Sequence, residues 1–356
     1  MTTVAGAPVI AAVARYAEEE LRPAAMDVDA AEVPAATIER LRGLGVLNHL
    51  APAAFGGAGL DRDADRLLHE ILSGACFNTW LVWAQHAPFV GRLAANLNSG
   101  PSPLAERLLR GEILCGAGIS DVRRYPDRYV AATRTPGGWV FDGTLSWVSG
   151  WGLSEVLAVA AVDPGTAEVV TALVPVSDRT IATPLRLSTV TGSRTERVRL
   201  DRVPVADENV LSVQSFDEWR LADAALSGDA RPHLFGLAEA VLRDLDAEPH
   251  EAARECAAAW RPQIARFRAH AYGLADEAAD TEGPHRIEER LALKVTVLEA
   301  LGTLTRALTA SRSGHGIAAG DRAQLLARAA QFCLVQGQSA AVRDAHLKRL
   351  TAAASG

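Results

Sequence analysis

Cysteine is scarce in this sequence, and its spacing fits neither a disulfide framework nor a zinc site. The four cysteines are Cys76, Cys115, Cys256 and Cys333, and no two of them form a Cys-x-x-Cys pair. Small secreted folds and structural zinc sites both depend on such spacing. We therefore expect buried free thiols and no bound metal.

Long hydrophobic runs and an excess of positive charge are also missing. No apolar run approaches the roughly 20 residues that cross a bilayer, and Met1-Thr2-Thr3-Val4 lacks the basic segment of a secretory signal. Thirty-six lysines and arginines stand against 43 aspartates and glutamates, a net charge of −7. This balance argues against nucleic-acid or anionic-membrane partners. We expect a cytoplasmic protein.

The hydrophobic pattern changes its period twice along the 356 residues. Helical periodicity covers residues 1–112, short apolar runs separated by turn residues cover 113–212, and long helical segments return over 213–356. With 49% hydrophobic residues, the chain can bury a large core. We predict an α+β protein with an N-terminal helical domain, a middle β-barrel-like domain and a C-terminal four-helix bundle, divided at these boundaries.

The middle and last parts give the clearest element boundaries. Apolar runs between turn dipeptides predict six strands, and apolar stripes at helical spacing predict four bundle helices. The expected strands are 129–134, 139–141, 144–149, 156–162, 169–176 and 195–200, and the expected helices are 232–245, 251–279, 287–310 and 321–341.

Aromatic residues make up only 5% of the chain, yet three tryptophans fall within residues 139–151. Asp142-Gly143 is typical of a tight turn, which predicts a hairpin in which Trp147 and Ser149 share one face. A flat ring beside a hydroxyl can stack on a planar heterocycle and bond its edge. The alternative is packing in the domain's own core, and periodicity alone favours it.

Several strings together resemble the acyl-CoA dehydrogenase superfamily over nearly the whole chain. They are Leu41-Arg42-Gly43-Leu44-Gly45-Val46 with the following loop at Phe55-Gly56-Gly57-Ala58-Gly59, then Asp142-Gly143-Thr144-Leu145-Ser146-Trp147-Val148-Ser149-Gly150, and Arg197-Val198-Arg199-Leu200-Asp201-Arg202-Val203-Pro204-Val205. The resemblance implies the predicted order of domains and a flavin. It also implies that Trp147 packs on the isoalloxazine and Ser149 hydrogen-bonds it.

Two departures concern the cofactor. The family's Thr-Glu-Pro-x-x-Gly-Ser-Asp motif corresponds to Cys115-Gly116-Ala117-Gly118-Ile119-Ser120-Asp121-Val122-Arg123-Arg124, in which Ser120 can present a hydroxyl or a backbone N–H to flavin; a plain turn residue is the alternative. The family's Arg-x-x-Phe-Gly segment, which helps hold the FAD pyrophosphate, has no clear counterpart. The cofactor is therefore FAD or, alternatively, a diffusible reduced flavin such as reduced FMN.

A third departure concerns catalysis. By resemblance, the usual catalytic Glu falls on Gly320, which offers no base for abstracting the α-proton of an acyl thioester. A base placed elsewhere in the bundle would have to be a residue such as Asp223, Asp229 or Asp321, for which a solvated surface role is the alternative.

Two histidines are candidate catalytic groups. His86 follows a Trp-rich helical turn where members of the monooxygenase branch carry a polar pocket residue; a satisfied structural histidine is the alternative. His315 lies between two glycines on the loop that faces the family's active site, and it could shuttle a proton. For His315 the alternative is an exposed loop histidine.

These observations predict a flavin-dependent oxidoreductase with altered chemistry, such as monooxygenation of a small organic or acyl-thioester substrate by reduced flavin and O₂. That reaction needs no carboxylate at position 320. A dehydrogenase with a relocated base is one alternative, and a flavin-free scaffold or partner subunit is another. We expect a homodimer or homotetramer, with a flavin reductase as a possible partner of the monooxygenase.

Overall fold

The computed structural model describes residues 8–97, 100–281 and 285–354. The segment Met1-Thr2-Thr3-Val4, used above to argue against a secretory signal, lies outside these residues. Two compact units can be described. The first contains the described residues up to Leu68, Asn78–Leu187 and Thr191–Trp219, and the second contains His69–Phe77, Ser188–Val190 and the described residues from Arg220 on. The three-domain boundaries given above stay a prediction.

The first unit joins the N-terminal helices to a mixed sheet. Its strands run in the order β6-β7-β3-β2-β4-β5-β8, and β1 pairs with β4 in parallel. The strands are β1 (Cys115–Gly118), β2 (Ala131–Thr135), β3 (Gly138–Val148), β4 (Val156–Asp163), β5 (Glu168–Pro175), β6 (Thr180–Pro184), β7 (Glu196–Ala206) and β8 (Val210–Ser215). The helices are α1 (Pro8–Tyr16), η2 (Ala17–Leu21), α2 (Arg22–Ala30), α3 (Ala35–Gly43), η3 (Ala53–Phe55), the first half of α4 (Arg62–Ala75), most of α5 (Phe77–Ala84), α6 (Ala87–Ala95) and α7 (Pro103–Leu109), with the short turns η5 (Ser120–Arg124), η6 (Thr191–Ser193) and η7 (Asp207–Asn209).

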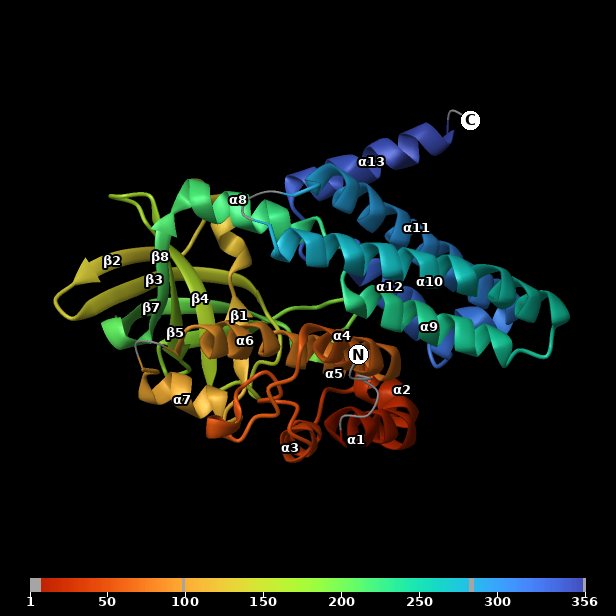
Figure 1. Cartoon of the computed structure of the whole chain (residues 1–356), viewed down its shortest axis with the longest axis horizontal. Coiled ribbons are helices and arrows are strands. Elements are labelled where there is room, and N and C mark those ends of the chain that lie inside the picture. The colour runs from red at the N-terminus through yellow and green to blue at the C-terminus, as the bar shows by residue number, and fades with distance from the viewer. Residues whose placement is uncertain (1–7, 98–99, 282–284, 355–356) are drawn as a thin grey trace. The chain divides into compact units, whose positions relative to one another are not determined.

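Apolar runs build the centre of this sheet. The strands β4 and β5 are buried along almost their whole length and pair in antiparallel register, with Asp163 opposite Glu168 next to the turn that joins them. One face packs on the core formed by β2, β3 and β7. Phe89 of α6 and Leu108 of α7 pack against β1, β4 and β5, so these two helices cover part of the sheet (Figure 1).

The second unit is helical, as the sequence predicts. It contains α9 (Pro232–Asp246), α10 (Glu251–Ala279), α11 (Ile287–Ser311), η8 (Ser313–Ile317), α12 (Arg322–Cys333) and α13 (Ala340–Ala354), and α8 (Phe216–Ser227) leads into it. Figure 1 shows α9, α10 and α11 running side by side. The expected fourth bundle helix, 321–341, is too long, because α12 ends at Cys333 and α13 begins only at Ala340.

The α+β class and the order helical, sheet, helical are confirmed. The hairpin expected at Asp142-Gly143 is wrong. Both residues lie inside the single strand β3, and Gly143 has a φ of +145° at an irregularity in the pairing with β7. An added Cβ on Gly143 would lie 2.9 Å from the Tyr129 carbonyl oxygen, so this position needs glycine for a close approach and not for a turn. The observed hairpin joins β2 to β3.

The described helices include none with the length and hydropathy needed to cross a bilayer.

Candidate functional site

The end of β3 contains a bulge. Leu145 pairs with Val198 of β7 and Val148 pairs with Glu196. Between these two pairs β3 therefore has two residues, Ser146 and Trp147, where β7 has one. An extra residue on one strand of an antiparallel pair shifts the alternation of its side chains. Leu145 and Val148 both belong to the core as a result, and Trp147 does not follow Leu145 inward.

Trp147 is consequently turned to the surface. All seven tryptophans lie in the described part of the chain, and Trp147 alone among them is exposed, at 43%. By contrast, Trp139 is 7% exposed and belongs to the sheet core. No hydrogen bond or ring contact joins the Trp147 indole to the described residues. Trp147 is therefore not packed in the core of the sheet, which was the alternative for this residue.

A polar network fixes the bulge to η5. The buried Asp121 carboxylate accepts from the Ser146 backbone N–H at 2.7 Å and from the Ser146 hydroxyl at 2.6 Å. The Ser146 oxygen in turn accepts from Nη1 of Arg124 and from Nη2 of Arg128, each at 3.0 Å. Because Asp121 and Ser146 are 2% and 4% exposed, these bonds have little competition from water.

Ser120 and Ser149 lie on either side of this network. Ser120 opens η5, is half-buried and makes no side-chain hydrogen bond with the described residues. Ser149 lies just past the end of β3, and its hydroxyl bonds the Thr195 hydroxyl at 2.8 Å. Thr195 bonds the Ser193 hydroxyl at 2.7 Å. Trp147 and Ser149 flank the core residue Val148, and the expectation that their side chains share one face stays a prediction.

His86 is fully buried between the N-terminal helices and β1. Its Nε2 donates to the Leu47 carbonyl at 2.6 Å, and its Nδ1 accepts from the Cys115 backbone N–H at 3.1 Å. Desolvation lowers the pKa of His86 to about 4, so the ring is neutral near pH 7. Both ring nitrogens are thus used for structure. The catalytic role of His86 stays a prediction, and these contacts favour the structural alternative.

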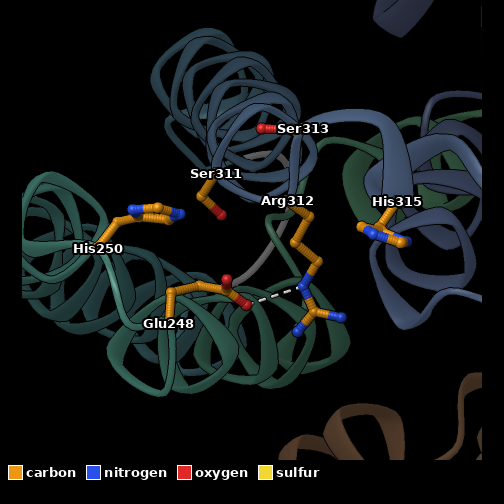
Figure 2. Close-up of a pocket in the computed structure, with 6 residues that line it drawn as sticks. All are labelled: Glu248, His250, Ser311, Arg312, Ser313 and His315. Atoms are coloured by element: carbon orange, nitrogen blue, oxygen red, sulfur yellow. Dashed lines mark hydrogen bonds and ion pairs between the residues drawn. The ribbon is translucent and has the colours of Figure 1, made fainter.

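His315 lies in the second unit, on η8, at the wall of an open hollow of about 400 Å³ (Figure 2). The other lining residues are Glu248 and His250 between α9 and α10, Ser311 and Arg312 at the end of α11, and Ser313 at the start of η8. Arg312 donates to Glu248 at 2.8 Å and to Asp321 at 3.0 Å. His315 is exposed, and the proton-transfer role stays a prediction.

Two of the three carboxylates proposed as relocated bases are engaged elsewhere. Asp229 pairs with Arg290 at 2.6 Å, and Asp321 pairs with Arg312 and accepts from the Ala323 backbone N–H as the cap of α12. A proton-abstracting base needs a desolvated and unpaired carboxylate, so these two aspartates are poorly suited. Position 320 is exposed, and a Cβ added there would meet nothing within 4 Å.

The residues at the end of β3 fit a planar, polar-edged ligand such as a flavin. The indole of Trp147 offers an exposed flat surface, and the Ser120 hydroxyl is unbonded among the described residues. The Ser149 hydroxyl keeps hydrogen-bonding capacity beyond its bond to Thr195. No group of three or more His, Cys, Asp or Glu side chains suited to a metal occurs in the described ranges.

The sequence does not reveal the buried residues that hold Ser146 and Ser149 in place. In the sequence, Asp121 and Ser146 stand out only as parts of motifs, and Thr195 only as the start of a predicted strand. One signal was available, namely the charged string Asp121-Val122-Arg123-Arg124 close to a predicted flavin contact. The bulge leaves no such mark, because Leu-Ser-Trp-Val reads as ordinary strand alternation.

Comparisons with known proteins agree on one family. The model of the acyl-CoA dehydrogenase N-terminal domain matches residues 8–98. Human mitochondrial short-chain specific acyl-CoA dehydrogenase is 29% identical over 155 residues, which are 42% of this chain and only 38% of that enzyme.

Solved structures share the fold over almost the full length. Butyryl-CoA dehydrogenase from Megasphaera elsdenii superposes with a TM-score of 0.78 at 15% identity, covering 99% of both chains. A nitrososynthase from Micromonospora carbonacea var. africana gives a TM-score of 0.78 at 19% identity, covering 99% of this chain and 97% of that one. Residues 8–98 thus match the N-terminal domain of acyl-CoA dehydrogenases, and the chain shares the fold of the acyl-CoA dehydrogenase structures over nearly its whole length.

Proposed function

We propose that this protein is a flavin-dependent oxidoreductase that uses reduced flavin and O₂ to oxygenate a small organic or acyl-thioester substrate. The observation that carries the proposal is the outward-turned indole of Trp147, 43% exposed on the strand that the family resemblance assigns to the flavin. Bound flavin supplies the electrons and the oxygen chemistry. The chain's own part is to stack on the ring through Trp147 and to bond its edge through Ser149 and Ser120.

Two findings favour oxygenation over ordinary dehydrogenation. Position 320 provides no carboxylate, and Asp229 and Asp321 are held in ion pairs. The cofactor is FAD, with reduced FMN as the alternative. We further propose that the protein forms a homo-oligomer and receives its reduced flavin from a separate flavin reductase.

One carboxyl supports the alternative of a dehydrogenase with a relocated base. Glu196 lies on β7 and pairs with Val148 of β3. Val148 stands between Trp147 and Ser149 in the sequence. Burial raises the pKa of the Glu196 carboxyl, and its Oε2 has no hydrogen-bond partner in the described part of the chain. However, Glu196 alternates in phase with the core residues Val198 and Leu200, which places it on the side of the sheet away from Trp147.

Flavin titration in both redox states tests the proposal. We expect the purified protein to bind reduced FMN or FAD more tightly than the oxidised form. When the complex is exposed to air, we expect the absorbance spectrum of the bound flavin to change slowly. A protein that is purified yellow and reduces its flavin with acyl thioesters alone would point to the dehydrogenase. No flavin uptake in either redox state would contradict both and leave the scaffold alternative.

A further inference from the structure

Two guanidinium groups converge on one hydroxyl at the bulge. Arg124 Nη1 and Arg128 Nη2 each lie 3.0 Å from Ser146 Oγ, so the two nitrogens are within about 6 Å of each other. The Ser146 hydroxyl gives its own hydrogen to Asp121. Like charges at this separation repel. The pair is thus favoured when a further anion lies close to it.

The charges around this pair do not balance. Among the described residues, one carboxylate bonds here, that of Asp121, which already accepts two bonds from Ser146 and lies 3.4 Å from Arg124. Arg128 forms no ion pair with the described residues. The nearby acidic side chains Asp127 and Asp142 are exposed and bond neither arginine in the described structure.

A third arginine adds to the excess. Arg197 is the β7 residue opposite the bulge, alternating out of phase with the core residue Val198, and it is exposed. It has no hydrogen bond or ion pair with the described residues. Arg197 therefore adds a third positive charge on the strand that pairs with the bulge.

The arginines keep most of their donors available. Arg124 uses only Nη1 and Arg128 only Nη2 in the bonds described, while a guanidinium carries five N–H donors. The Arg124 side chain is 47% exposed. A planar fork of free N–H groups matches the oxygens of a phosphate, and arginine is well suited to such contacts.

We propose that Arg124 and Arg128, held in place by Ser146 and Asp121, bind a phosphate group of a ligand whose planar ring lies on Trp147. Arg197 adds positive charge across the bulge. The phosphate belongs either to a flavin nucleotide or to a nucleoside diphosphate substrate, two sources with the same chemistry. In the flavin case the inference rests on the proposed function; the phosphate site itself does not require it.

Equilibrium binding to the purified full-length protein tests this site. The probes are riboflavin against reduced and oxidised FMN, and uridine and thymidine against their diphosphates, each at low and at raised ionic strength. Arg128→Gln is the test variant, because Arg128 is exposed and its loss leaves Asp121 and Arg124 paired. Arg134→Gln is the matched control. It removes one positive charge near the opposite end of β3, where Arg134 pairs with Asp207.

We expect Arg128→Gln to raise the Kd of a phosphorylated probe about tenfold, to leave its unphosphorylated partner unchanged, and to reduce the salt dependence. Arg134→Gln should bind all probes like wild type. An effect limited to FMN assigns the phosphate to the flavin, and one limited to a diphosphate assigns it to the substrate.

The site is refuted if Arg128→Gln and Arg134→Gln behave alike, or if no phosphorylated probe binds more tightly than its unphosphorylated partner. The two proposals also separate. Flavin binding that ignores Arg128 overturns the phosphate site alone. Diphosphate binding that depends on Arg128, in a protein that takes up no flavin, overturns the proposed function alone. Thermal unfolding confirms that both variants are folded.

Discussion

The end of β3 in the first unit and the His315 loop in the second carry sequence strings that resemble the same family, but they are built differently. At β3 a buried carboxylate and a buried hydroxyl fix the backbone, and one large aromatic side chain is left free at the surface. At the His315 loop the charged side chains satisfy one another, with Arg312 held by Glu248 and Asp321. At the end of β3, the Trp147 ring is therefore available to contact a ligand. At the His315 loop, the charged side chains form structural ion pairs with one another.

This difference distinguishes residues that support the fold from residues that are available to bind a ligand. Residues that hold the bulge or the start of β1 are buried and hydrogen-bonded, so their loss should cost stability. Exposed residues with no partner in the chain should cost little stability but affect a ligand. The following predictions test that separation.

The largest effect is expected for His86→Ala. It leaves the Leu47 carbonyl and the Cys115 N–H without their buried partner, and we expect a loss of about 3 to 4 kcal/mol in the free energy of unfolding. Chemical denaturation at pH 7.5 measures it. A loss below about 1 kcal/mol would show that His86 does not support β1.

The same residue predicts a pH dependence. Burial lowers the pKa of His86 from 6.5 to about 4 in the folded protein, so the unfolded chain takes up the proton first as the pH falls. Stability is therefore full above pH 6.5 and declines between pH 6.5 and 4, by roughly 3 kcal/mol from this group. Because burial also lowers the pKa of His233, the informative quantity is the difference between wild type and His86→Ala. An unchanged slope in the variant would contradict the assignment.

Asp121→Ala should have the next largest effect. It removes the acceptor for the Ser146 N–H and hydroxyl and leaves Arg124 without its ion pair. We expect a loss of about 2 to 3 kcal/mol, measured by denaturation, together with weaker ligand binding because the bulge is no longer fixed. Ser146→Ala should lose less stability, since Asp121 keeps the backbone N–H. Equal stability losses in the two variants would argue against Asp121 as the main support.

In the second unit, Arg312→Gln should lose about 1 to 2 kcal/mol, since Glu248 and Asp321 are both largely buried and lose a charged donor. His315→Ala, from the same hollow, should change stability by less than about 0.5 kcal/mol. Thermal unfolding of the two variants side by side measures the contrast. A destabilised His315→Ala with a stable Arg312→Gln would reverse our reading of this loop.

Much of the fold could be predicted because long periodic segments dominate it. The apolar runs of β4 and β5 and the long stripes of α9 to α11 define their elements in the sequence alone. The short strands β1, β6 and β8 were missed, because four to six residues with small or mixed side chains carry no clear period.

The candidate site could be predicted only in part. Trp147 was found from its surroundings in the sequence, but for an incorrect structural reason. Asp142-Gly143 reads as a turn, whereas Gly143 allows a close approach within one strand, and the exposure of Trp147 comes from a bulge that depends on pairing with β7. The contacts of Asp121 with Ser146 are set by tertiary structure across 25 positions of the chain, beyond the reach of any local pattern.

The central claim is that the outward-turned indole of Trp147 forms one wall of a flavin site. Titration of reduced FMN into wild type and Trp147→Ala, followed by flavin fluorescence and absorbance, tests it most directly. We predict a Kd about tenfold to hundredfold higher in the variant, as expected for a lost stacking surface, with the free energy of unfolding changed by less than about 0.5 kcal/mol. Equal affinity for reduced flavin in the two proteins would contradict the account.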